Sequence, residues 1–193
     1  AAVTPLYTVA EAEKSLAYLD GYPYRNTVTV GNGMTCTFYD AGHILGSAIS
    51  LITARENGRT ARMAFTGDIG RFGKPILNDP TLVFAEAERV LNRLSVKPGM
   101  RVADIGAGDG YYTVRLAQRL GPGGTIYAED IARPYLDRLA ERLAREGIAG
   151  VTLVHGTPAD PRLPERSVDL ALLAHMYHEV EQPYEFLYRL HTG

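Results

Sequence analysis

The stretch VADIGAGDG, residues 102–110, is the most informative part of this sequence about its fold. The apolar run Val102–Ile105 leads into glycine at every second position, Gly106, Gly108 and Gly110, and then into a helical pattern. Glycine has no Cβ, so the chain can turn sharply there and its backbone can lie against a ligand. Open parallel α/β sheets bind ligands at the carboxyl ends of their strands. The stretch therefore predicts a strand, a ligand-binding loop and a helix.

Strands and helices alternate around this stretch, on the carboxyl side of residue 80. Helices are expected over Ala85–Leu94, Tyr111–Leu120, Pro134–Arg145 and from Pro183 to Leu190. Strands are expected over Val102–Ile105, Thr125–Ala128, Val151–Val154 and Val168–Ala174. Such alternation predicts right-handed βαβ units in an α/β fold, a Rossmann-like, doubly wound parallel sheet of about four strands.

The first eighty residues predict a different arrangement. Gly31-Asn32-Gly33 and Asn57-Gly58 are hairpin-turn sequences between β-rich runs, and a helix is expected over Ala10–Leu19. The β-rich runs are Thr27–Val30, Met34–Tyr39, Ala48–Ala54 and Arg59–Phe65. We expect an antiparallel piece whose pairing is satisfied locally by its hairpins.

Composition narrows the class of protein. Hydrophobic residues make up 46 % and charged residues 22 % of the 193 residues, the balance of a globular protein. The formal charge of −2 argues against a strong general affinity for nucleic acid. Cys36 is the single cysteine, which excludes an internal disulfide and a cysteine-based zinc cluster. A single cysteine makes the reducing cytoplasm the simplest expectation for the location of the protein. The sequence shows no apolar run of membrane-spanning length and no signal-peptide pattern.

An acidic pair closes the second predicted strand of the parallel sheet. Glu129 and Asp130 follow Ala128, and a carboxylate at this place can accept both ribose hydroxyls of a nucleoside cofactor. Asp130 is the first choice and Glu129 the second. The alternative is a solvated acidic pair ahead of a helix, where aspartate is also a good N-cap. The glycine loop at the expected distance favours the cofactor.

From Arg89 to Leu190 the chain resembles bacterial class I S-adenosylmethionine-dependent methyltransferases. The loop has their Asp-x-Gly-x-Gly-x-Gly spacing, whereas the dinucleotide fingerprint needs a glycine where Tyr111 stands. Also similar are VLNRLSVKPGMRV (residues 90–102), GTPADPRLP (156–164) and SVDL (167–170). The resemblance implies a methyltransferase domain over residues 84–193 that transfers a methyl group to an unknown acceptor.

The same resemblance implies roles for single residues. Those expected to bind S-adenosylmethionine are Asp104, Gly106, Gly108, Gly110, Asp130, Ile131 and Asp160. The glycines would line its methionine part, and Asp104 would brace their loop. Asp130 would hold the ribose and Ile131 would pack on adenine. Asp160, or Thr157 in its place, would meet the adenine amino group.

Two histidines follow the fourth strand of the parallel sheet. His175 or His178 could act as a base toward the acceptor. Methyl transfer from a sulfonium can also proceed largely by positioning, without a base. The alternative for these two residues is a polar loop between a strand and a helix. A metal site at this His-x-x-His pair lacks a further nearby histidine or cysteine.

Two motifs near the amino end resemble a second family. YDAGHILGSA (residues 39–48) and FTGDIGR (65–71) are similar to metal-ligand motifs of metallo-β-lactamase-fold nucleases of the β-CASP group. The resemblance implies that His43 ligates one zinc and that Asp68 bridges two. The family's main cluster, His-x-His-x-Asp-His, is absent from this sequence, so the zinc ligand set is incomplete.

The two resemblances divide the chain at residues 1–80 and 84–193, and a recombined, spliced or engineered chimera explains them best. Metal-dependent hydrolysis, with RNA as partner, is the alternative function, and a non-catalytic chain is the third. The methyltransferase sheet normally continues through three more strands, whereas this sequence ends at Gly193. The apolar run Val168–Ala174 is therefore expected at an open sheet edge, where unpaired backbone groups promote self-association.

Overall fold

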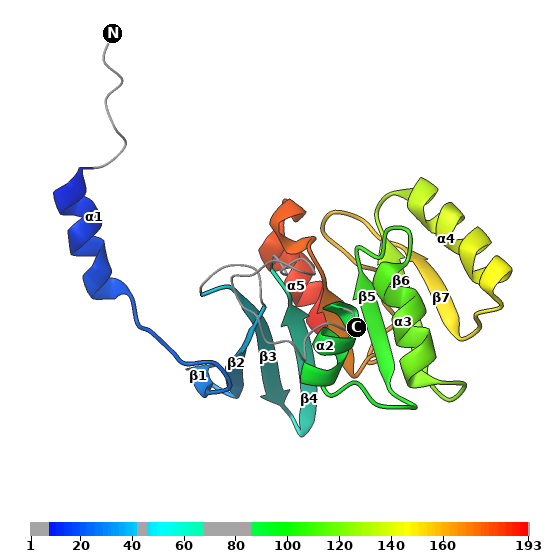
Figure 1. The fold of residues 1–193 in the computed structure, drawn as a ribbon, viewed down its shortest axis with the longest axis horizontal. Coiled ribbons are helices and arrows are strands. Elements are labelled where there is room, and N and C mark those ends of the chain that lie inside the picture. Colours follow the sequence, from blue (N-terminus) through cyan, green and yellow to red (C-terminus); the bar gives the residue numbers. More distant parts are fainter. Residues whose placement is uncertain (1–7, 42–45, 68–85, 193) are drawn as a thin grey trace, which may run out of the picture.

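A computed structural model of the chain describes residues 8–41, 46–67 and 86–192. Its centre is one mixed sheet of eight strands in the order β1-β2-β3-β4-β8-β5-β6-β7 (Figure 1). The strands are β1 (Thr27–Gly31), β2 (Met34–Asp40), β3 (Ala48–Glu56), β4 (Arg59–Phe65), β5 (Arg101–Ile105), β6 (Thr125–Asp130), β7 (Val151–His155) and β8 (Leu170–Leu173). The chain is therefore an α/β protein, as its sequence predicts.

Helices cover the parallel part of the sheet on both faces. They are α2 (Glu86–Arg93), α3 (Tyr111–Leu120), α4 (Arg133–Glu146) and α5 (Pro183–Thr192), and a 3-10 turn spans Tyr177–Glu179. Residues of α2 and α3 pack with Val102, Ile126 and Leu172, whereas Phe186 and Leu190 of α5 pack with the alternate strand positions. Successive strand residues point to opposite faces, so α5 lies on the face opposite α2 and α3.

The amino-terminal strands form the predicted antiparallel meander. β1 pairs with β2, β2 with β3, and β3 with β4, all antiparallel. The β3–β4 turn has positive φ at both Asn57 (49°) and Gly58 (76°), the conformation that an Asn-Gly hairpin turn requires. Local turn chemistry therefore accounts for this half of the sheet.

The position of β8 corrects one expectation. The run Val168–Ala174 was expected at an open edge, but β8 lies between β5 and β4 and is parallel to both. Met63 is opposite Ala171 and Phe65 is opposite Leu173 in the β4–β8 pairing. One edge of β4 pairs with β3, and its other edge pairs with β8. The hairpins therefore leave one edge of β4 available to the parallel strands. The physical reason for expecting self-association through β8 is thereby removed.

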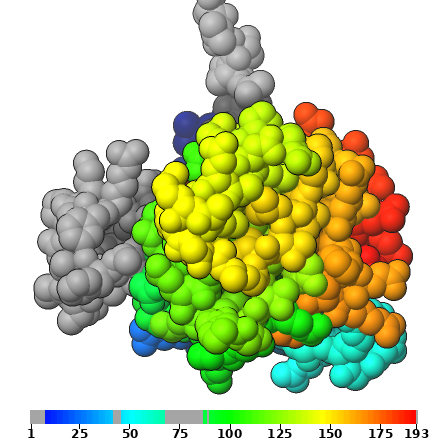
Figure 2. Space-filling model, turned by 90° about the vertical axis from the view of Figure 1, so that its right-hand side faces the viewer, coloured from blue at the N-terminus to red at the C-terminus, as the bar shows by residue number. Residues whose placement is uncertain are grey.

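The largest apolar core joins the two halves. Ile49 and Leu51 of β3 and Ala64 of β4 are buried in the same cluster as Leu91 of α2 and Leu172 of β8. Figure 2 shows the β3–β4 hairpin in cyan below the orange segment that precedes β8. Residues of these two segments, including Arg59 and Arg166, line a common surface cavity of about 470 Å³.

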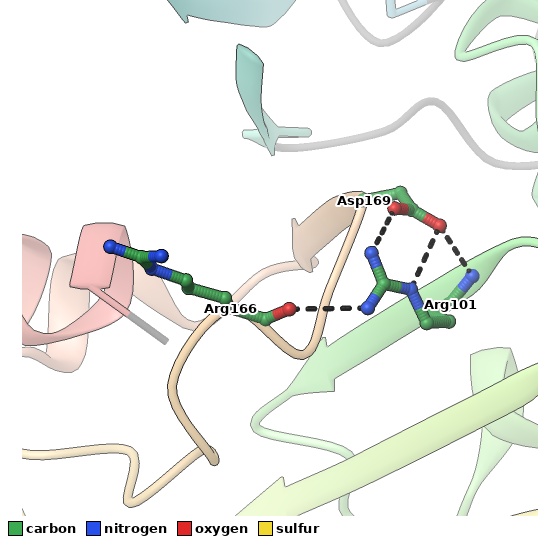
Figure 3. Close-up of polar contacts among 3 residues, drawn as sticks. All are labelled: Arg101, Arg166 and Asp169. Carbon is green, nitrogen blue, oxygen red and sulfur yellow. Dashed lines mark hydrogen bonds and ion pairs between the residues drawn. The ribbon is translucent and has the colours of Figure 1, made fainter. Parts of the chain in front are cut away.

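A charged cluster fixes the amino ends of β5 and β8. The guanidinium of Arg101 lies 2.6 Å from Oδ1 of Asp169, and the Arg101 backbone N–H donates to Oδ2 of the same carboxylate at 2.9 Å (Figure 3). Arg101 also donates to the carbonyl of Arg166 at 3.1 Å. This cluster lies at the end of the strands opposite the glycine loop.

Helix α1 (Val9–Ser15) stands away from the sheet (Figure 1) and buries no residue. Its start carries a capping box, in which Thr8 and Glu11 satisfy each other's backbone N–H groups. Among the described residues, no helix is both long and apolar enough to cross a membrane.

Candidate functional site

The glycine loop connects β5 to α3 at the carboxyl edge of the parallel strands. Gly106, Gly108 and Gly110 have φ values of 68°, 54° and 83°, in the left-handed region that L-residues with a side chain rarely adopt. These angles explain why glycine stands at all three positions.

The three glycines differ in their surroundings. A Cβ on Gly110 would lie 2.3 Å from Leu139 Cδ1, and one on Gly106 would lie 2.9 Å from the Met176 side chain. A Cβ on Gly108 would meet nothing within 4 Å. Gly110 therefore allows the loop to pack on α4, Gly106 allows Met176 to lie against it, and Gly108 leaves open space above the backbone.

Asp104, which was expected to brace the glycine loop, lies on β5 two residues before Gly106. The side chain is 2 % exposed, and Oδ2 accepts a hydrogen bond from the Thr113 hydroxyl at 2.6 Å. Burial raises the pKa of Asp104 to about 6. Because Thr113 belongs to α3, this bond ties β5 to the helix that follows the loop.

Asp130, at the end of β6, contacts the loop directly. Its Oδ2 accepts from the Gly108 N–H at 2.9 Å, and its Oδ1 accepts from the Ala132 N–H at 2.8 Å. The side chain is 8 % exposed. Each carboxylate oxygen has a second lone pair, so Asp130 can hold the loop and still accept from a ligand.

Glu129 precedes Asp130 and is more deeply buried. It is 1 % exposed, and its Oε2 accepts from the Gly106 N–H over a long 3.4 Å. Its Oε1 has no hydrogen-bond partner among the described residues. Burial is the main cause that raises the pKa of Glu129 to about 8, and the neighbouring carboxyls of Asp130, Asp104 and Asp160 raise it further.

A cavity of about 500 Å³ opens beside these carboxyls, at the carboxyl ends of the parallel strands. Its size suits a small-molecule ligand or cofactor. The lining residues are Gly106, Gly108, Glu129, Asp130, Ile131, Ala132, Tyr135, Thr157, Pro158, Ala174, His175, Met176, Glu179, Val180, Glu181 and Phe186. Four of the seven predicted cofactor residues are thus brought to one cavity, the two glycines with Asp130 and Ile131.

The predicted adenine contacts are only partly brought to the cavity. Ile131 is 55 % exposed and lines the cavity. Thr157 and Pro158 line it as well, whereas Asp160 does not. Oδ1 of Asp160 instead accepts from the Arg162 N–H at 2.7 Å. The cavity therefore favours Thr157, the alternative to Asp160.

The structure separates the two candidate bases. His175 lines the cavity, whereas His178 does not, and its side chain is 70 % exposed beside Glu179. The His175 N–H donates to the hydroxyl of Thr66, a fully buried residue just after β4, at 3.3 Å. The amino-terminal segment therefore supports the backbone of the loop that carries His175.

The predicted zinc ligands cannot be placed. His43 and Asp68 both lie outside the described residues. Within residues 8–41, 46–67 and 86–192, no group of three or more His, Cys, Asp or Glu side chains could hold a metal ion.

Several lining residues could not be found from the sequence. Met176 and Phe186 come to the cavity because the chain turns back after β8 and α5 packs on the sheet. Tyr135 lies in the first turn of α4, where helical spacing alone gives no sign of a ligand. A motif at a strand end identifies the loop that follows the strand. It does not identify the cavity residues that belong to elements later in the chain.

Comparison with known proteins agrees with this geometry. Residues 102–192 match the profile of the family described as "Methyltransferase domain". Nocamycin O-methyltransferase of Saccharothrix syringae is 37 % identical over 84 residues, which are 44 % of this chain and 30 % of that protein. Demethylmenaquinone methyltransferase of Anoxybacillus flavithermus is 32 % identical over 79 residues, 41 % of this chain and 33 % of its own length.

A solved structure extends the comparison to the fold. An S-adenosylmethionine-dependent methyltransferase from Aquifex aeolicus superposes with a TM-score of 0.54 at 29 % identity, over 60 % of this chain and 61 % of that chain. The aligned segment spans about a third of the length of the two curated relatives above. Residues 102–192 are therefore similar, in sequence profile and in fold, to the methyltransferase domain of class I S-adenosylmethionine-dependent methyltransferases.

Proposed function

We propose that the chain binds S-adenosylmethionine in the cavity beside the glycine loop and transfers its methyl group to an acceptor. The observation that carries the proposal is the cavity itself. It brings Gly108, whose backbone lies open, and Asp130, whose carboxylate has spare lone pairs, to one wall. The match of residues 102–192 to the methyltransferase domain profile supports the choice of ligand.

The residues at the cavity fit the parts of the cofactor. The open backbone at Gly108 would lie against the methionine part, Asp130 would accept from the ribose hydroxyls, and Ile131 would cover one side of adenine. Thr157 would meet the edge of the ring. When bound, the cofactor supplies a sulfonium methyl group that is electrophilic without further activation.

The chain's own residues would act mainly by positioning. Two reactants held in line react as if at a very high local concentration, which is a sufficient source of rate for this chemistry. Of the two candidate bases, His175 is the one at the cavity and is proposed to take a proton from the acceptor.

The Asp130→Ala variant tests the proposal. Removing two hydrogen bonds to a charged acceptor should weaken binding of S-adenosylhomocysteine at least about tenfold in a calorimetric titration. Asp137→Ala, which removes an exposed carboxylate on α4 paired with Arg133, is the matched control and should bind normally. Equal affinities of the two variants, or no binding by the unaltered chain, would contradict the proposal.

The remaining expectations stand as parts of the proposal. The division at residues 1–80 and 84–193 is proposed to mark segments of different origin, even though both contribute strands to one sheet. A cytoplasmic location is proposed from the single cysteine.

Metal-dependent RNA hydrolysis is the alternative function, but no observation on the described residues favours it. We expect no cleavage of single-stranded RNA when zinc or manganese is added.

A further inference from the structure

Two neighbouring carboxyls at the end of β6 differ in how far their hydrogen-bonding capacity is used. Asp130 accepts from two backbone N–H groups at 2.8 and 2.9 Å. Glu129 accepts one long bond of 3.4 Å from Gly106, and its Oε1 has no partner among the described residues. Buried polar atoms are normally paired, so an unpartnered carboxyl oxygen calls for an explanation.

The surroundings of Glu129 leave room for this carboxyl. A Cβ on Gly156, which follows β7, would lie 1.8 Å from Oε1, so only glycine fits at that position. The carboxyl thus lies between the loop after β5 and the loop after β7, and the residue belongs to the cavity wall. Because the bond to Gly106 is long and therefore weak, most of the acceptor capacity of this carboxyl is unused.

We propose that Glu129 is a second cofactor-binding carboxylate, whose free oxygen accepts a hydrogen bond from a donor group of bound S-adenosylmethionine. The inference rests on the proposed function and deepens it, because it assigns the ligand two adjacent acidic contacts instead of one. Asp130 then serves both the glycine loop and the ligand, whereas Glu129 serves mainly the ligand.

Charge favours a donor-rich, cationic ligand at this place. Besides the Gly106 N–H, which favours the ionised form of Glu129, the charged groups that act on it are Asp104 on β5, Asp130 on β6 and Asp160 after β7, and all three are carboxyls. His155, at the end of β7, faces the carbonyl of Ile131 at 3.0 Å. S-adenosylmethionine brings hydroxyls, amino groups and a sulfonium charge, which relieve the repulsion among these carboxyls.

The proposal implies that binding releases a proton. Glu129 is mainly protonated in the free protein at pH 7, because its pKa is about 8. A donor from the ligand stabilises the ionised carboxylate, so the proton that occupies Glu129 passes to the solvent. Affinity should therefore rise with pH from about 6.5 to about 8.5, by at least about fivefold, through this group alone.

Titrations with S-adenosylhomocysteine test the inference. Binding heats are compared in two buffers of different ionisation enthalpy at pH 7, for the unaltered chain and for Glu129→Gln, Glu129→Leu and Glu141→Gln. Glutamine is nearly the shape of a protonated glutamate and keeps the fold, and Glu141 is an exposed control on α4. The unaltered chain and Glu141→Gln should release a large fraction of a proton that Glu129→Gln does not release.

The outcomes separate the two proposals. Weaker binding by Glu129→Gln at pH 8.5, with a flatter pH profile and no extra proton release, supports the role of Glu129. Glu129→Leu should bind weakly throughout. If the unaltered chain binds but Glu129→Gln matches it in affinity and proton release, Glu129 is not a ligand contact and the proposed function stands. If the unaltered chain does not bind at any pH, both proposals fail.

Discussion

Two inner strands of the sheet, which belong to its parallel half (β5 to β8), differ in burial from the two outer strands of its antiparallel half (β1 to β4). β5 and β8 are buried almost throughout, whereas β1 and β2 are mostly half-buried or exposed. The three buried carboxyls among the described residues, Asp104, Glu129 and Asp130, all belong to the parallel half. One half is thus held by local hairpins, and the other carries the polar groups of the candidate site.

The two halves meet in a single pairing, β4 with β8. This pairing covers the edge that the methyltransferase segment would otherwise leave open, and it places Thr66 against the loop of His175. An antiparallel hairpin can therefore complete a parallel sheet when its last strand runs in the matching direction.

The largest effect is expected from a charge placed in this junction. Ala64 is fully buried on β4 opposite Leu172, so Ala64→Asp buries an unpaired carboxyl. The loss in free energy of unfolding should be at least about 3 kcal/mol in a urea titration. Thr60→Asp, on the exposed start of the same strand, should cost less than about 1 kcal/mol.

The same variant also tests what β4 protects. If Ala64→Asp releases β4 from β8, the exposed edge of β8 should promote association with other chains. Sedimentation at several concentrations should show larger species for this variant than for Thr60→Asp. Equal stability and equal sedimentation of the two variants would mean that β4 does not hold the sheet together.

The free energy of unfolding should depend on pH through a residue of the parallel half. The pKa of Glu129 is raised from 4.5 to about 8, so the folded state binds a proton more tightly than the unfolded state. This contribution to stability is fully present below about pH 4.5 and is lost as pH rises through about 8. The free energy of unfolding should fall over this range.

Glu129→Gln removes this titration. The unaltered chain should lose stability as pH rises from about 5.5 to about 8.5, whereas the variant should not lose this contribution. The free energy of unfolding of the variant, measured in urea, should therefore rise relative to that of the unaltered chain by more than about 1 kcal/mol over this range. Asp104, whose pKa of about 6 is also raised by burial, keeps its own titration in both proteins. Parallel stability curves for the two proteins would show that Glu129 does not titrate in this way.

A smaller effect is expected at the contact between the halves. Thr66→Val removes the hydroxyl that accepts from the His175 N–H and should cost about 1 kcal/mol of stability. Because residues 174–176 line the cavity, S-adenosylhomocysteine should also bind a few-fold more weakly. Thr66→Ser keeps the hydroxyl and should restore the affinity; failure of serine to do so would point to the methyl group instead.

The smallest effect is expected at the far end of the strands. Asp169→Asn removes the ion pair with Arg101, but both side chains are more than a third exposed, so the cost should be about 0–1 kcal/mol. Arg101 holds the pKa of Asp169 below its usual range, so this contribution is present at neutral pH and is lost as the solution becomes acidic. The difference in free energy of unfolding between Asp169→Asn and the unaltered chain should be smaller in high salt than in low salt.

The elements that could be predicted from the sequence are those determined by neighbouring residues. The Asn57-Gly58 turn, the helix over Tyr111–Leu120 and the glycine loop all follow from residues close together in the chain. The β4–β8 pairing does not, because the partners Phe65 and Leu173 are far apart in sequence and neither segment encodes the other. The prediction of an open edge was wrong for that reason.

The candidate site divides in the same way. Gly106, Gly108 and Asp130 could be named in advance, because a strand end places them together. The preference for Thr157 over Asp160 and the approach of Met176 depend on how loops fold back over the sheet. The unused oxygen of Glu129 could be recognised only once its neighbours were known.

Hydrogen–deuterium exchange with and without S-adenosylhomocysteine would locate the bound ligand on the chain. Protection is expected in residues 104–110, 129–135 and 156–158, and also at residues 174–176, which the end of β4 supports. β1 and β2 should exchange equally in both samples. Protection confined to the antiparallel half, or none at all with saturating ligand, would contradict the placement of the cofactor site.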